Sequence, residues 1–313
     1  MDTSTTKQPE TSGFERNAVP PSRLGRSGPD FLYTFHAMAT PCEVRLETED
    51  AALAEVVARV AEVEARRIEQ KFSRYRSDSV VGKINSSGGK ELAVDAETAH
   101  LLDFAAQCFQ VSGGLFDVTS GVLRRIWRFD GSDRIPTEAQ IRSLRSLIGW
   151  QKVSWRAPAI VLPAGMEIDL GGLAKEYAVD KALAAIREIT PQPALVNFGG
   201  DLCVTGPRKY GARWKVAIES VEQNGQLAGM LELADGALAT SGDARRFLLK
   251  DGIRYGHILN PRTGRPVEQT PRSVTVAAAT CIEAGMIATL AMLQGKRAEA
   301  FLKREGVRAW CIR

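Results

Sequence analysis

Residues 165–206, GMEIDLGGLAKEYAVDKALAAIREITPQPALVNFGGDLCVTG, carry in turn the patterns of a strand, a helix and a further strand. A short apolar stretch ends at a Gly-Gly pair, and a helix is expected from Ala174 through Arg187, where Thr-Pro-Gln-Pro interrupts it. Residues 194–206 are rich in apolar and β-branched side chains and are bounded by Gly and Asp, as strands usually are. The segment therefore predicts a fold that mixes helices and strands.

Similar patterns extend toward both ends of the chain. Apolar and polar residues alternate from Phe31, break at 39–41 and resume through Leu46, which predicts two strands. Apolar positions spaced by three and four residues over 51–71 predict an amphipathic helix, and a second helix is expected over 96–112. The remaining expected elements are a strand near 151–162, strands within 213–220, 229–242, 254–260 and 273–280, and a last helical region from Glu283 to Lys303.

Length and composition are sufficient for a large folded domain. The chain has 313 residues, 44% of them hydrophobic, which is enough to bury a core. We expect an α+β fold in which residues 31–313 form a single large domain, with a mixed or antiparallel sheet flanked by helices. Residues 1–30 are rich in Ser, Thr, Pro and Gly and are expected to form a disordered tail.

Charge and composition argue against several classes of protein. The 41 basic and 37 acidic residues leave a net charge of +4, and the arginines are scattered, so nucleic acid is not an expected partner. No run of about 18 apolar residues is present and the N-terminus has no apolar leader, so we expect a cytoplasmic protein without a membrane partner. The five cysteines are widely spaced and suggest neither a disulfide framework nor a zinc site; we expect them to be small buried hydrophobes. No pattern in the sequence indicates the oligomeric state.

Residues 237–264, ALATSGDARRFLLKDGIRYGHILNPRTG, concentrate polar side chains that a purely structural segment would not need. Ser241 and Asp243 lie at the end of an expected strand, and His257 is one of only three histidines. Histidine titrates near neutral pH, and the Asn-Pro-Arg-Thr-Gly turn after it would present it at a strand end. This pattern indicates a functional site.

Two Gly-Gly turns beside acidic residues suggest a shared cleft. The turns consist of Asp169, Gly171 and Gly172, and of Gly199, Gly200 and Asp201. Glycines let a ligand approach the backbone, and the helix N-terminus that follows the first turn, with Lys175 in its first turn, favours a phosphate. Each turn also has a structural alternative, a tight strand-to-helix connection for the first and a β-bulge or turn for the second.

Three further residues have a functional and a structural interpretation. Asp117 and Thr119 lie in a turn before an expected helix, where simple N-capping would explain them. Tyr75 lies in a polar loop, where its ring could stack on a planar ligand, although surface tyrosines are common.

Taken in order, eight segments resemble the ApbE family, the FAD:protein FMN transferases, from about Met38 to Leu293. The matching segments are 38–40 (MAT), 72–75 (FSRY), 114–119 (GLFDVT), 147–153 (LIGWQKV), 168–175 (IDLGGLAK), 194–201 (ALVNFGGD), 239–243 (ATSGD) and 257–264 (HILNPRTG). Each is weak alone, but eight in the same order are highly specific. The resemblance implies a T-fold-related flavin-binding domain in which FAD is split at its pyrophosphate, with Mg²⁺ usually bridging the phosphates. FMN then passes through a phosphoester bond to a threonine of an acceptor protein, and AMP is released.

The resemblance also implies roles for individual residues. The residues expected to bind FAD are Met38, Thr40, Tyr75, Asp117, Thr119, Asp169, Gly171, Gly172, Lys175, Gly199, Gly200, Asp201, Ser241, Asp243 and His257. Met38 and Tyr75 would flank the isoalloxazine ring, while Asp117 and Thr119 would contact the adenosine half. Lys175 and the Gly-Gly turns would lie beside the phosphates. His257 would be the acid–base group for the incoming threonine hydroxyl, with Lys175 as the second catalytic residue.

The chain departs from the family pattern at the metal site. The family has Glu-Ala-Asp-x-x-x-Thr, whose Asp and Thr bind the ion together with a main-chain carbonyl corresponding to that of Ala174. Here residues 283–289 read EAGMIAT, so Thr289 is retained but Gly285 replaces the aspartate. The family usually has glycine after the Ala-Lys pair, where this chain has Glu176.

Glu176 has two interpretations. It could supply the missing negative ligand from the opposite wall of the site, or it could be a solvated first-turn residue that favours the helix dipole. The missing aspartate leaves three functions to compare: FMN transfer, binding of FAD or FMN without transfer, and hydrolysis of FAD at its pyrophosphate.

Overall fold

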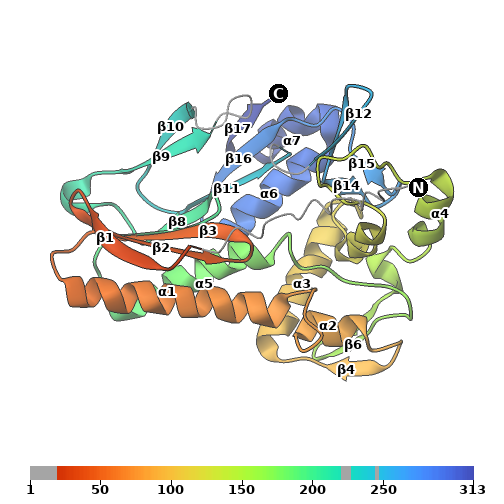
Figure 1. Cartoon of the computed structure of the whole chain (residues 1–313), viewed down its shortest axis with the longest axis horizontal. Coiled ribbons are helices and arrows are strands. Elements are labelled where there is room, and N and C mark those ends of the chain that lie inside the picture. Colours follow the sequence, from red (N-terminus) through yellow and green to blue (C-terminus); the bar gives the residue numbers. More distant parts are fainter. Residues whose placement is uncertain (1–19, 220–226, 244–246) are drawn as a thin grey trace, which may run out of the picture.

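The computed structural model describes residues 20–219, 227–243 and 247–313, and an eight-stranded antiparallel sheet forms its centre (Figure 1). The strand order is β1-β2-β3-β7-β8-β11-β16-β17. Every neighbouring pair in this order is antiparallel. The predicted α+β class, with a mixed or antiparallel sheet flanked by helices, is therefore confirmed, and the sheet is antiparallel.

The elements have the following bounds. The helices are α1 (Ala51–Phe72), α2 (Val80–Asn85), α3 (Ala96–Val111), α4 (Glu138–Arg145), α5 (Ala174–Ile189), α6 (Cys281–Leu293) and α7 (Ala298–Glu305), with 3-10 turns η1 (Val118–Arg125), η2 (Trp150–Lys152), η3 (Lys209–Gly211) and η4 (Gly295–Arg297). The sheet strands are β1 (Arg23–Ser27), β2 (Asp30–Ala37), β3 (Thr40–Leu46), β7 (Ala194–Phe198), β8 (Asp201–Val204), β11 (Ala237–Gly242), β16 (Ser273–Ala278) and β17 (Arg308–Ile312). Smaller sheets contain β4 (Glu91–Ala93), β5 (Ser154–Arg156) and β6 (Ala159–Val161), β9 (Trp214–Glu219) and β10 (Leu227–Leu233), β12 (Phe247–Lys250) and β13 (Ile253–Gly256), and β14 (Leu259–Asn260) and β15 (Arg265–Pro266).

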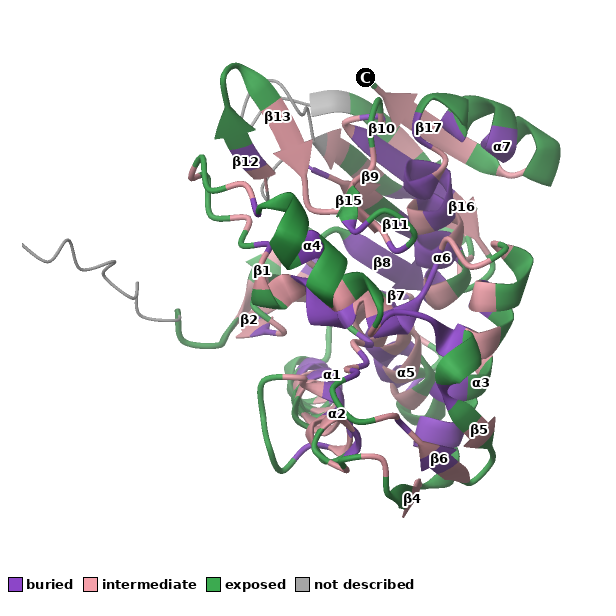
Figure 2. Ribbon diagram, turned by 90° about the vertical axis from the view of Figure 1, so that its right-hand side faces the viewer, coloured by how far each residue is buried: buried purple, intermediate pink, exposed green. Residues whose placement is uncertain are grey.

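Both faces of the central sheet are covered. Val196 and Cys203 point to the face packed by α1, α5 and α6, and belong to the main hydrophobic core. Their neighbours Leu195 and Leu202 point the other way and pack with Trp214 of β9 in a separate cluster. Because successive strand residues face opposite sides, covering both faces explains why β7 and β8 are apolar apart from Asn197 and Asp201 next to their shared turn. Figure 2 shows the buried residues gathered along β7, β8 and α6.

Helix α1 illustrates how the sequence sets a helix. Asp50 caps its N-terminus, with a carboxylate that accepts hydrogen bonds from the backbone N–H groups of Ala52 and Leu53. Its buried residues recur at spacings of three and four, as one apolar face requires; they are Ala54, Val57, Ala58, Ala61, Ala65, Ile68 and Phe72. The prediction of an amphipathic helix over 51–71 is confirmed.

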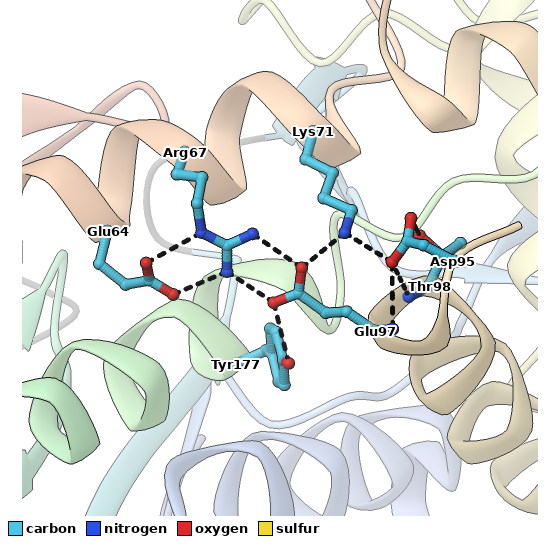
Figure 3. Close-up of polar contacts among 7 residues, drawn as sticks. All are labelled: Glu64, Arg67, Lys71, Asp95, Glu97, Thr98 and Tyr177. Atoms are coloured by element: carbon cyan, nitrogen blue, oxygen red, sulfur yellow. Dashed lines mark hydrogen bonds and ion pairs between the residues drawn. The ribbon is translucent and has the colours of Figure 1, made fainter.

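An ion-pair network fastens α1 to the starts of α3 and α5 (Figure 3). Arg67 of α1 donates hydrogen bonds to both carboxylate oxygens of Glu97 in α3, at 2.7 and 2.6 Å. Lys71 bridges Glu97 and Asp95, at 2.6 and 2.7 Å. The hydroxyl of Tyr177, in the first turn of α5, donates to Glu97 at 3.1 Å. The network thereby helps to hold the N-terminus of α5.

Three sequence predictions need correction. The strand expected near 151–162 is the β5–β6 hairpin preceded by η2. The helical region expected from Glu283 to Lys303 is two helices, because the chain turns through η4 at Gly295, which has a φ of +58°. Part of the expected tail over 1–30 is ordered, since β1 pairs with β2 from Arg23 to Ser27. Residues 1–19, 220 and 244–246 of the predicted segments lie outside the described residues.

Candidate functional site

Two hairpin turns meet at one end of the sheet. Met38 and Ala39 form the β2–β3 turn with φ values of +53° and +56°, unusual for residues other than glycine. The β7–β8 turn lies next to it, because the backbone N–H of Gly199 donates to the carbonyl of Pro41 at 2.9 Å. A side chain at Gly199 would overlap that of Thr40. The structure therefore brings together Met38, Thr40 and the second Gly-Gly turn.

Lys175 and Asp201 form an ion pair beside these turns. The Lys175 ammonium contacts the carboxylate of Asp201, whose side chain is only 2% exposed. Burial alone would lower the pKa of Lys175, but the negative charges of Asp201 and Glu176 outweigh it and raise that pKa. The other Asp201 oxygen accepts from the backbone N–H of Thr240 at 3.0 Å. This bond ties β11, and with it Ser241, to the same cluster.

Glu176 is buried between α5 and α6. It is 9% exposed, and its Oε2 atom is buried without a hydrogen-bond partner. Burial raises the pKa of Glu176 to about 8, with Asp201 acting in the same direction and Lys175 opposing. The interpretation of Glu176 as a solvated first-turn residue is therefore wrong, because the side chain points into the protein. Its position beside α6 arises from tertiary packing.

The metal site implied by the resemblance can be tested against these residues. A hard divalent cation takes oxygen ligands, and Glu176 offers a buried carboxylate oxygen with no other partner. Gly285 lies directly opposite it, and Thr289 is four residues further along α6, on the same helical face. No group of three or more His, Cys, Asp or Glu side chains in the described ranges could hold an ion. The donor set fits a cation that takes its other ligands from hydroxyl, carbonyl and substrate oxygens.

The loop before α5 carries the first Gly-Gly turn. Asp169 accepts from the N–H of Gly171 at 2.8 Å, and its other oxygen lies 3.5 Å from Arg74 and 3.3 Å from Arg124. Gly171 and Gly172 are exposed, and α5 has no side-chain cap at its N-terminus. A helix N-terminus without a side-chain cap, next to exposed glycines, favours an anion.

His257 lines a cavity of about 260 Å³. The other lining residues come from three segments of the chain and combine cationic with aromatic groups; they are Arg74, Tyr75, Arg124, Trp127, Arg128, Phe129 and Leu259. The His257 ring meets that of Phe129 edge-on, with centroids 6.3 Å apart. The indole N–H of Trp127 donates to the carbonyl of Gly264 at 2.8 Å and fastens the histidine segment to this wall. The cavity unites Tyr75 with His257, which the sequence places far apart.

Tyr75 is held by two arginines. Its side chain is exposed, the guanidinium of Arg74 lies over its ring at 4.7 Å from the centroid, and its hydroxyl accepts from Arg74 and Arg124 at 3.3 and 3.4 Å. Burial would raise the pKa of Tyr75, but hydrogen bonding to Arg74 and the two positive charges lower it. Arg124, Arg128 and Phe129 were not among the predicted site residues, although RRIWRF over 124–129 groups arginines with aromatic residues as a ligand site often does.

Asp117 and Thr119 do not line the cavity. Asp117 accepts from the N–H and the hydroxyl of Thr119 at 2.8 and 2.6 Å, and from the N–H of Trp150 at 3.1 Å. Thr119 is 0% exposed and accepts from the N–H of Gly149 at 2.7 Å. The expected contact with an adenosine does not fit this burial. The N-cap interpretation is correct for Asp117, which caps η1.

Asp243 is also buried and forms ion pairs within the protein. It is 5% exposed and pairs with Arg254 at 3.2 Å and with Arg272 at 2.9 Å. These pairs hold the start of the 243–256 segment near β16. The expected direct contact of Asp243 with FAD does not fit this environment, and its effect on the site is indirect.

Four of the five cysteines are buried, as expected of small hydrophobes, and Cys311 is half-buried. Within the described ranges, no helix is long and apolar enough to cross a membrane.

The structure is an α+β protein with an antiparallel sheet, glycine turns at one end of that sheet and a cavity lined by basic and aromatic residues. The chain belongs to the ApbE family, whose sequence model matches residues 38–311. It is 31% identical over 237 residues to the FAD:protein FMN transferase of Vibrio cholerae, covering 73% of this chain and 70% of that protein. It is 30% identical to the enzyme of the same name from Treponema pallidum, covering 86% and 80%.

Solved structures agree with this assignment. The ApbE protein of Thermotoga maritima superposes with a TM-score of 0.82 at 28% identity, covering 90% of this chain and 94% of the other. The family resemblance predicted from eight short segments is thus confirmed.

Proposed function

We propose that this protein is an FAD:protein FMN transferase, which cleaves FAD and attaches FMN through a phosphoester bond to a threonine of an acceptor protein, releasing AMP. The observation that carries the proposal is the cavity that joins His257 to arginines and aromatic rings. Relatives that are about 30% identical to this chain over the aligned residues bear the name FAD:protein FMN transferase. A non-transferring flavin binder would need the arginines and rings but no acid–base group.

Binding of FAD requires neutralisation of its pyrophosphate and stacking of its ring. Arg74 and Arg124 offer positive charge at the cavity, and the uncapped N-terminus of α5 offers backbone N–H groups. Tyr75 would stack on one side of the isoalloxazine ring and Met38 on the other. Thr40, Ser241 and the exposed glycines of the two turns would approach the phosphates and the ribityl chain.

In the transfer step the acceptor threonine oxygen attacks the FMN phosphorus. The bond from that phosphorus to the bridging oxygen breaks, AMP leaves with the bridging oxygen, and the threonine proton passes to His257. Lys175, kept protonated by Asp201, would offset negative charge on the phosphoryl oxygens. Asp117 and Thr119 would act indirectly, by holding η1 and the 149–150 turn.

A divalent ion fits beside this machinery. The carbonyl of Ala174, the hydroxyl of Thr289 and the carboxylate of Glu176 are the protein groups that would hold Mg²⁺. When bound, the ion would neutralise charge that develops on the pyrophosphate.

The test is incubation of the purified full chain with FAD, with and without Mg²⁺ and with a threonine-containing acceptor protein. We expect AMP to be released with Mg²⁺, and the acceptor to gain the mass of FMN. AMP with free FMN and an unmodified acceptor would indicate the pyrophosphatase instead. Bound FAD that stays intact under all metal conditions would eliminate both enzymatic functions in favour of the binder. The cytoplasmic location stays a prediction from the sequence.

A further inference from the structure

The Glu176 carboxyl group is buried, and its protein neighbours leave it incompletely hydrogen-bonded. The residue is 9% exposed, and Oε2 has no hydrogen-bond partner. The nearby cation, Lys175, is in contact with Asp201. The next acid on the same face of α5, Asp180, accepts from the N–H groups of Cys281 and Ile282 at 2.8 and 2.9 Å. A buried carboxylate of this kind calls for a cation or a proton.

Gly285 provides the space that Glu176 occupies. A Cβ atom at position 285 would lie 2.6 Å from Cγ of Glu176, closer than such atoms pack, and 3.0 Å from its Oε1, which is also a tight contact. The helices are in antiparallel register here: one turn along α5, from Glu176 to Asp180, corresponds to one turn back along α6, from Gly285 to Cys281. The two positions therefore share one space, in which only one of them can carry a large side chain.

We propose that Glu176 supplies the anionic ligand of a divalent cation from α5, in place of a carboxylate from position 285 of α6. Thr289 lies one turn beyond Gly285 on the same face of α6, and the carbonyl of Ala174 is two residues before Glu176. The chain thus keeps one carboxylate and one hydroxyl at the site, but the carboxylate comes from the opposite wall. The protein ligands then carry the same net charge as they would with a carboxylate at position 285. For a hard cation this charge matters more than which helix supplies the carboxylate.

The proposal deepens the proposed function, on which it rests for the substrate, but it can be tested without FAD. Mn²⁺ is titrated into the full chain, and free Mn²⁺ is measured by its paramagnetic resonance signal. We expect Glu176→Gln, which keeps the shape and removes the charge, to weaken Mn²⁺ binding at least about tenfold. Glu283→Gln removes an exposed carboxylate from the same helix and should leave the affinity unchanged.

An exchange variant tests the shared space directly. In Glu176→Ala/Gly285→Asp the carboxylate returns to α6, and alanine avoids the helix penalty of glycine. We expect its Mn²⁺ affinity to recover to within about threefold of the wild type, while Glu176→Ala alone stays weak. Thermal unfolding of each variant establishes that it is folded before titration. Equal affinity in the wild type and Glu176→Gln, or no recovery in a folded exchange variant, would overturn the proposal. Mn²⁺ binding through Glu176 without AMP release from FAD would leave this proposal standing and refute the transferase.

Discussion

Removal of the Glu97 charge should destabilise the protein in a manner that depends on pH. Hydrogen bonding to Arg67, and further to Lys71, lowers the pKa of Glu97 to about 2 from an ordinary value of 4.5, against the opposing effect of burial. The difference between these two pKa values corresponds to a contribution of at most about 3.4 kcal/mol to the free energy of unfolding. The Glu97 side chain is 18% exposed and that of Arg67 is 40% exposed, so solvent screening reduces the expected contribution to about 1–2 kcal/mol.

The direction of the pH dependence follows from the lowered pKa of Glu97. The stabilisation is fully present above pH 4.5, where the unfolded carboxyl is ionised, and is lost as pH falls toward 2. Urea unfolding of the wild type and Glu97→Gln should differ by about 1–2 kcal/mol at pH 7, with more than half of that difference gone at pH 3. Glu55→Gln removes a carboxylate that is 56% exposed and paired only within α1, and should change stability by less than about 0.5 kcal/mol. An equal difference for Glu97→Gln at both pH values would refute the reasoning.

Three further perturbations test the packing and chemistry of the site. Gly285→Ala places a Cβ 2.6 Å from Cγ of Glu176 and should lower the free energy of unfolding in urea by about 1–3 kcal/mol. This loss should largely disappear when Glu176 is also changed to Ala, and its persistence in the double variant would contradict the assigned clash. Trp127→Phe removes the hydrogen bond to the carbonyl of Gly264 and should cost about 1–3 kcal/mol, with weaker flavin binding in a fluorescence titration; unchanged stability would show that the bond contributes nothing. His257→Gln should reduce the rate of AMP release from FAD by about 10²–10⁴-fold while FAD still binds, and full activity would rule out histidine as the base.

Local patterns were sufficient for the elements with strong periodicity. The apolar spacing over 51–71 predicted α1 to within one residue, and the breaks around 39–41 and at 190–193 placed the ends of β2 and α5 closely. The hairpin at 154–161 and the division of 283–303 at Gly295 were missed. In both cases a tight turn, at 157–158 and at Gly295, divides a region that was predicted as one element, and hydrophobic periodicity alone does not mark such a turn.

The site was only partly predictable for a related reason. His257, Lys175 and the Gly-Gly turns could be selected because their residue types and neighbouring turns are unusual for a scaffold. Asp117 and Asp243 carry the same polar groups, and the sequence could not show that hydrogen bonds and ion pairs inside the protein already use them. Whether a polar side chain faces a ligand or the interior depends on partners distant in the chain.

The sequence by itself determined the family and the order of the principal elements. It also showed that position 285 is a glycine without a carboxylate and that position 176 is a glutamate. Only the tertiary structure decided that these two positions face each other. A charged residue in the first turn of a helix is expected in solvent, because burial of a carboxylate is costly. The packing of α5 against α6 overrides that local preference, since the missing side chain at Gly285 leaves the space that Glu176 fills. The register between two helices more than a hundred residues apart is a property of the folded core.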